Sequence, residues 1–148
     1  MKKRIFSMLT LLTLLFSFTC VAYAAEPAET VSVVTEDLGN GFTAVVTTTV
    51  SHPMARTSYV DGYRNWDISY LGSKIGSVSL TVRFSYNGSS ATAMQAVASH
   101  STSSGWSYSN EKVTCSGNKG TISAKFSKNG SSTSINKSIS CSPTGVIS

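Results

Sequence analysis

The sequence predicts an all-β protein, an immunoglobulin-like antiparallel β-sandwich of about eight strands preceded by a cleavable export signal. Three observations predict this fold class. Apolar residues alternate with Ser, Thr and Arg between Val78 and Tyr86, a period of two that is typical of a half-buried strand. Asn-Gly pairs, which favour tight hairpin turns, recur between such segments. No segment carries a sustained apolar stripe at the helical period.

The amino terminus has the three parts of an export signal. Lys2-Lys3-Arg4 is cationic, residues 5–18 are mostly apolar, and Ala22-Tyr23-Ala24 places small residues where a signal peptidase reads them. The apolar run is shorter than the roughly 20 residues that a membrane-spanning helix needs. We therefore expect cleavage near Ala24 or Ala25 and secretion of residues 25–148 as a single domain with no integral membrane span.

The strands of the secreted domain are expected to follow one another as hairpins. Two-residue turns are predicted at Asn40-Gly41, Asn87-Gly88 and Asn129-Gly130, each between two segments rich in Val, Thr and Ser. Further strands are expected at about residues 66–71 and 106–115. Many short strands with Asn and Gly turns indicate a sandwich.

Two cysteines, Cys115 and Cys141, remain after cleavage, and an even pair in an exported chain predicts a disulfide. The strands that end at these cysteines flank a third strand that starts at Thr121. Neighbouring strands lie about 4.8 Å apart, so two cysteines across a middle strand exceed the ~7 Å that a disulfide spans between Cα atoms. We therefore expect one outer strand to leave that sheet, and the disulfide to join the two sheets or a sheet to its terminal segment.

The charge of the secreted domain does not suggest nucleic-acid binding. Three of the 12 basic residues lie in the signal, which leaves nine against seven acidic residues. From Arg83 to Ser148 the sequence contains six basic residues and one acidic residue, Glu111. This uneven distribution either attracts the domain weakly to anionic wall polymers or membrane surfaces, or simply solvates strand faces and resists aggregation.

The sequence contains one candidate set of catalytic groups. The two histidines, His52 and His100, lack the spacing of a zinc site, and neither a metal nor a cofactor is expected. Asp61 and Asp67 could form a glycosidase-like pair, although two Asx turns explain them equally well. We expect no enzymatic activity.

The segment from Tyr59 to Tyr70 is the candidate ligand surface because it concentrates aromatic and charged residues. Its candidate contacts are Tyr59, Tyr63, Arg64 and Trp66. The alternative is that Trp66, or Trp106, is the core tryptophan of the sandwich. If Trp66 points inward, the surface shrinks to the other three residues, which are expected on the turn before this strand. Replacing Tyr63 with Ala should then weaken binding without unfolding the domain.

Residues 76–92 contain Phe84-Ser85-Tyr86-Asn87-Gly88-Ser89-Ser90-Ala91-Thr92 and are followed by Gly105-Trp106 and Ser116-Gly117-Asn118. This pattern resembles small secreted proteins of uncharacterised function from Gram-positive bacteria. The resemblance implies a secreted β-sandwich and assigns no catalytic or binding residue.

Two classes of function remain. The sequence favours a non-enzymatic extracellular module that binds a cell-envelope polymer such as a cell-wall glycan, or a partner protein. The alternative is a small secreted hydrolase or antimicrobial effector. Aromatic side chains exposed together would favour binding, whereas a cleft that brings His52 or His100 beside Asp61 or Asp67 would favour catalysis.

Overall fold

The computed structural model describes residues 29–52 and 58–148, and the predicted export signal lies outside these ranges. The described residues form eight antiparallel strands and no helix. None of them belongs to a helix that is long and apolar enough to cross a membrane. The strands are β1 (Glu29–Gly39), β2 (Phe42–Ser51), β3 (Tyr59–Tyr70), β4 (Ser73–Tyr86), β5 (Ala91–Thr102), β6 (Ser107–Ser116), β7 (Lys119–Lys128) and β8 (Ser131–Ser140).

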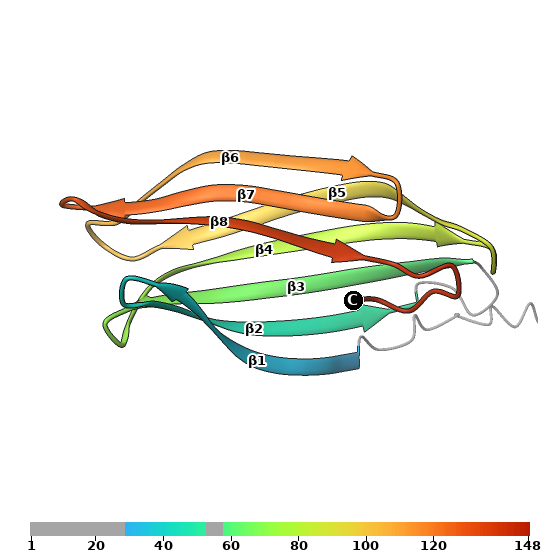
Figure 1. The fold of residues 1–148 in the computed structure, drawn as a ribbon, viewed down its shortest axis with the longest axis horizontal. Helices are drawn as coiled ribbons and strands as arrows, with labels where there is room; N and C mark the ends of the chain where they lie inside the picture. Colours follow the sequence, from blue (N-terminus) through green and yellow to red (C-terminus); the bar gives the residue numbers. More distant parts are fainter. Residues whose placement is uncertain (1–28, 53–57) are drawn as a thin grey trace, which may run out of the picture.

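The strands form two sheets that face each other. The first sheet has the order β1-β2-β3-β4-β5 and the second the order β6-β7-β8. In Figure 1 the second sheet lies over β3, β4 and β5, and contacts between the sheets join the same strands. The all-β prediction is therefore confirmed. Each strand pairs only with its neighbours along the chain, whereas immunoglobulin domains use Greek-key connections, so the immunoglobulin-like part of the prediction is not confirmed.

The core fills the space between the two sheets. In β4 the predicted alternation is confirmed, because Val78, Leu80, Val82 and Phe84 are fully buried while the residues between them are more exposed. The second sheet adds buried side chains from β7 and β8, namely Ile122, Ala124, Phe126, Ile135 and Ile139. The sheets approach closely at Gly120, where an added Cβ would lie 2.4 Å from a methyl group of Val82.

The predicted hairpins form, but one turn differs from the prediction. Asn40-Gly41 and Asn129-Gly130 both have two positive φ values, as a two-residue hairpin turn of this type requires. In the third hairpin only Gly88 has a positive φ, and the connection has four residues, 87–90. The Asn87 Oδ1 accepts hydrogen bonds from the backbone N–H groups of Ser89 and Ser90, so the Asn side chain stabilises a longer loop.

The predicted disulfide between Cys115 and Cys141 is wrong. Both cysteines are free; Cys115 is exposed and Cys141 is buried. The expectation that an outer strand leaves the sheet fails, because β6, β7 and β8 stay hydrogen-bonded in one sheet. Cys115 pairs with Gly120 of β7, whose partner on the other side is Ile139 of β8. The cysteines therefore lie on opposite sides of the middle strand, roughly two strand spacings apart, which a disulfide cannot span.

Candidate functional site

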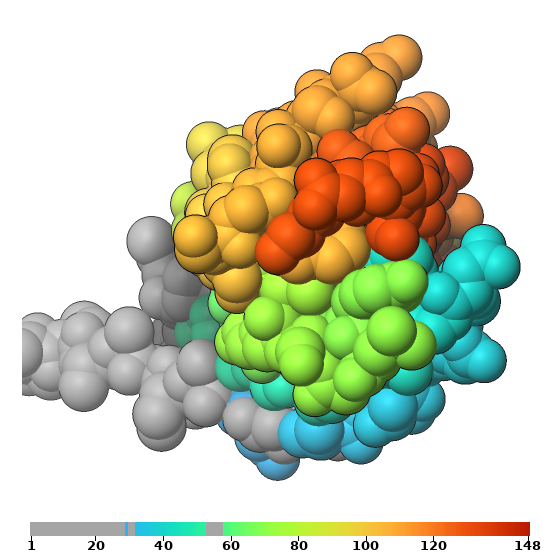
Figure 2. Space-filling model, turned by 90° about the vertical axis from the view of Figure 1, so that its left-hand side faces the viewer, coloured from blue at the N-terminus to red at the C-terminus, as the bar shows by residue number. Residues whose placement is uncertain are grey.

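Alternate connections of the chain meet at one end of the sandwich. Because consecutive strands are antiparallel, the β1–β2, β3–β4, β5–β6 and β7–β8 connections all lie at the left in Figure 1, and Figure 2 looks onto this end. The backbone N–H of Leu71 donates to the carbonyl of Gly41 at 2.9 Å, which ties the first two turns together. The N–H of Ser103 donates to the carbonyl of Ile75 at 2.8 Å, which ties the β5–β6 connection, the link from one sheet to the other, to β4.

Three aromatic rings pack together at this end. The ring centroids of Phe42 and Tyr70 are 4.5 Å apart, and that of Trp106 lies 5.9 Å from Phe42 and 5.6 Å from Tyr70 with edge-on geometry. Phe42 is buried, whereas Tyr70 and Trp106 are half-buried. The cluster therefore extends the core to the surface, and two of its rings are accessible to a ligand.

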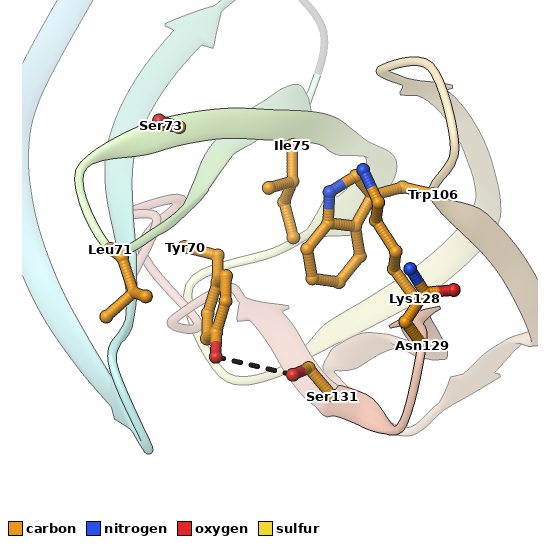
Figure 3. Close-up of a pocket in the computed structure, with 8 residues that line it drawn as sticks. All are labelled: Tyr70, Leu71, Ser73, Ile75, Trp106, Lys128, Asn129 and Ser131. Carbon is orange, nitrogen blue, oxygen red and sulfur yellow. Dashed lines mark hydrogen bonds between the residues drawn. The ribbon is translucent and has the colours of Figure 1, made fainter.

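Tyr70 and Trp106 line an open hollow of about 370 Å³ between the two sheets, which we call the end cleft. The Ser131 hydroxyl donates to the Tyr70 hydroxyl at 3.3 Å across it. Figure 3 shows the Lys128 side chain extending alongside the indole of Trp106. The full lining is Tyr70, Leu71, Ser73, Ile75, Trp106, Lys128, Asn129 and Ser131. The end cleft thus combines an apolar, aromatic wall with hydroxyl, amide and ammonium groups.

A second hollow of about 360 Å³, which we call the polar annex, continues the end cleft around the β7–β8 turn. The two share Lys128, Asn129 and Ser131. The remaining lining of the polar annex comes from small or polar residues, namely Gly105, Ser107, Lys125, Ser127, Gly130 and Ser132. The two hollows therefore adjoin at the β7–β8 turn.

The backbone at the mouth of the end cleft is strained. Leu71 has a φ of 47° and precedes Gly72, so it occupies the turn position that Asn40 and Asn129 occupy in the other two-residue turns. A left-handed conformation costs a branched residue such as Leu about 1–2 kcal/mol. The Leu71 side chain is 73% exposed, so burial offsets little of this cost. Strained backbone conformations cluster at functional sites, so this turn is a candidate for ligand contact.

The structure does not bring the four sequence-predicted contacts to one surface. Tyr59 and Tyr63 are 41% and 38% exposed on the outer face of β3. Trp66 is 1% exposed and belongs to the core. Arg64 also points inward, where its Nε donates to the Thr48 hydroxyl at 3.0 Å and its guanidinium to the Ser138 carbonyl at 3.1 Å. Only the two tyrosines therefore remain of the predicted surface.

The surroundings of Arg64 explain why a cation lies on an inner face. It lies near the open side of the sandwich, where β1 and β8 are edge strands, and Lys137 of β8 forms an ion pair with Glu36 of β1. Burial lowers the pKa of Arg64, and the nearby Glu36 carboxylate opposes this effect. Arg64 and Lys137 thus link the two sheets with polar contacts.

The geometry excludes Asp61 and Asp67 as a glycosidase pair. Both lie on the outer face of β3, six residues apart, which corresponds to about 20 Å along a strand, whereas glycosidase carboxylates lie within about 10 Å. Asp61 binds Arg83 through two hydrogen bonds of 2.8 Å. Asp67 binds Lys74 at 2.8 Å, and this hydrogen bond lowers the pKa of Asp67.

His100 contacts neither of these aspartates. Its ring stacks on Tyr108 of β6 with centroids 3.8 Å apart, and its Nδ1 lies 3.5 Å from the Glu111 carboxylate. The Tyr108 hydroxyl donates to the same carboxylate at 2.7 Å. Burial, reinforced by this hydrogen bond, raises the pKa of Tyr108.

His52 is exposed just after β2. Within residues 29–52 and 58–148, no three His, Cys, Asp or Glu side chains are grouped as a metal site.

Sequence reasoning missed the end cleft because its residues are far apart in the chain. Tyr70, Trp106 and Lys128 each stand beside a turn, and only Tyr70 falls within the candidate segment. The available signal was the alternation of connections, since every second turn of an antiparallel series lies at the same end.

The chain matches no protein-family model, no curated protein and no solved structure.

Proposed function

We propose that this chain is an exported, non-enzymatic extracellular module that binds a glycan of the cell envelope in the end cleft. The export part rests on the amino-terminal pattern of residues 1–24, with its cationic head, apolar run and small residues at the cleavage site. In this proposal the sandwich acts as immunoglobulin-like domains do, as a rigid scaffold that presents loops and turns at one end.

The observation that carries the proposal is the pairing of Tyr70 and Trp106 with polar groups in an open cleft. Aromatic rings offer flat apolar faces to the C–H faces of sugars, while hydroxyl and amide groups hydrogen-bond sugar hydroxyls. Ser131 and Asn129 supply such groups beside the rings. A concave site with an apolar wall and a few fixed polar groups is the usual form of a small-ligand site.

The alternative, a small secreted hydrolase or antimicrobial effector, has less support. Glycoside hydrolysis needs two carboxyl groups on either side of the bond that is cut. The residues that line the end cleft and the polar annex include no carboxylate. Asp61 and Asp67 are bound to cations on the outer face of the first sheet. Binding without hydrolysis is therefore the function that we favour.

The test compares two aromatic residues on different surfaces. We expect Trp106→Ala to weaken binding to a neutral N-acetylglucosamine tetrasaccharide about tenfold, because a central aromatic contact contributes more than 1 kcal/mol. Tyr63→Ala removes an exposed ring from the outer face of β3 and should leave the affinity unchanged. Titration calorimetry on the protein without residues 1–24 measures both. Binding that depends on Tyr63 and not on Trp106 would move the site to the surface that the sequence predicted.

A second variant covers the case in which Trp106→Ala loosens the aromatic cluster. Asn129→Gly removes the amide group from the end cleft, and Gly accepts the positive φ of this turn position. The fold should stay intact by circular dichroism while affinity falls. If the wild-type protein binds neither the tetrasaccharide nor purified cell walls, the proposed function is wrong.

A further inference from the structure

Building on the proposed function, we infer that the glycan is acidic: a sugar ring occupies the end cleft, and a carboxylate or phosphate group of the same chain lies in the polar annex between Lys125 and Lys128. Lys128 lines both hollows, so it stands where a ligand would pass from the aromatic wall to the polar annex. The inference deepens the proposed site by naming its ligand class.

A glycine, Gly105, leaves space for the Lys128 side chain. Gly105 has a φ of 79°, and a Cβ added there would lie 3.0 Å from the Lys128 Nζ. The absence of a side chain at Gly105 therefore leaves room for the ammonium group, which lies near the indole of Trp106 in Figure 3. The arrangement presents a positive charge next to a ring on which a sugar can stack.

The two lysines are available to an anion. Neither Lys125 nor Lys128 forms an ion pair with any residue that the structure describes, whereas Lys74, Arg83 and Lys137 each do. No carboxylate lines either hollow, and residues 103–148, which include β6, β7 and β8, contain five lysines and one glutamate. That glutamate, Glu111, already accepts a hydrogen bond from Tyr108 and lies beside His100.

The hydroxyl groups around the lysines fit a polar chain better than a bare ion. Ser107, Ser127 and Ser132 line the polar annex together with the two lysines. Lys125 lies on the outer face of β7 and Lys128 ends this strand beside the turn, and both side chains line the polar annex. A glycan that carries a carboxylate or phosphate group close to the stacked sugar would place that group between the two lysines.

The test uses two glycans that share one backbone. Peptidoglycan glycan strands freed of their peptides carry a carboxylate on every second sugar, and the N-acetylglucosamine tetrasaccharide is their neutral counterpart. The wild-type protein should bind acidic strands of equal length about five- to tenfold more tightly, and added salt should reduce this advantage. A glycerol phosphate oligomer, added as a competitor, tells whether phosphate replaces carboxylate in the polar annex.

Matched double variants locate the effect. Lys125→Gln with Lys128→Gln should abolish the preference for acidic strands, measured as the ratio of the affinities for the acidic strands and for the neutral tetrasaccharide. Lys112→Gln with Lys119→Gln removes the same charge from lysines that line neither hollow, and should keep the preference. Equal affinity of the wild type for both glycans, or equal loss in both double variants, overturns the inference and leaves the glycan-binding cleft standing. Failure of the wild type to bind either glycan overturns the proposed function itself.

Discussion

Trp66 and Trp106, the two tryptophans of the chain, have different surroundings. Trp66 lies between Val46 and Val78 on the inner face of the first sheet and is almost fully buried. Its Nε1–H has no hydrogen-bond partner among the residues that the structure describes. Trp106 is half-buried in the end cleft. One tryptophan therefore serves the core, and the other is placed to contact a ligand.

The unpartnered Nε1–H of Trp66 leads to a stability prediction. Trp66→Phe loses apolar volume but also removes a buried donor whose isolation costs about 1–3 kcal/mol. These effects oppose each other, so we expect the free energy of unfolding to change by about 1 kcal/mol or less. Trp66→Ala leaves a large cavity and should cost about 3–5 kcal/mol. Urea denaturation measures both, and similar losses in the two variants would contradict this account.

Residue-level prediction succeeded where the strand period decides the outcome. The sequence indicated that Trp66, Ile68 and Tyr70 share a face, and all three point inward. The same period places Arg64 on that face, but the strand was predicted to begin near Trp66 and Arg64 was assigned to the turn before it, whereas β3 begins at Tyr59. The contacts of Arg64 with Thr48 and Ser138 depend on strands distant in sequence, which a local pattern does not reveal.

At the scale of elements, turn chemistry was the most informative signal. Asn-Gly pairs located three hairpins, and the structure has strands on both sides of each. The β3–β4 turn escaped notice because Leu71 is not a typical turn residue. Its positive φ is imposed by the paired strands on either side of it, and Gly72 supplies the second left-handed position.

Leu71→Asn tests whether this strain is linked to binding. Asn tolerates a positive φ better than Leu, so the variant should raise the free energy of unfolding by about 0.5–1 kcal/mol. Loss of an apolar wall should at the same time weaken binding of the tetrasaccharide. Leu71→Ala keeps the strain and removes the side chain, so it should weaken binding without stabilising the fold. A less stable Leu71→Asn protein would show that Leu71 stabilises the turn through its contacts.

The disulfide prediction failed at the same scale for an instructive reason. It counted cysteines and assumed that an exported chain pairs them, although the spacing argument showed that a pair across β7 could not form within one sheet. The sheet kept all three strands because β6, β7 and β8 are joined by short turns and pair along their lengths. Strand pairing therefore decided the outcome, and no local feature of the cysteines indicated it.

For the whole molecule, the fold class was predictable and the site was not. Strand period and turn residues are local, so they gave the number and sequence of strands. The end cleft requires knowing how one sheet sits on the other, because Tyr70 belongs to the first sheet and Ser131 to the second. The sheets approach closely where Gly120 faces Val82, a contact between residues far apart in the sequence that no local pattern indicates.

The central claim is that a glycan binds beside Trp106, and nuclear magnetic resonance tests it most directly. The chain has two tryptophans, so the protein without residues 1–24 gives two indole N–H signals, and Trp66→Phe assigns them. On addition of the N-acetylglucosamine tetrasaccharide, we expect the Trp106 signal to shift with ligand concentration while the buried Trp66 signal stays in place. If the tetrasaccharide leaves the Trp106 signal unmoved, or shifts the backbone signals of Tyr59 and Tyr63 instead, the end cleft is not the binding site.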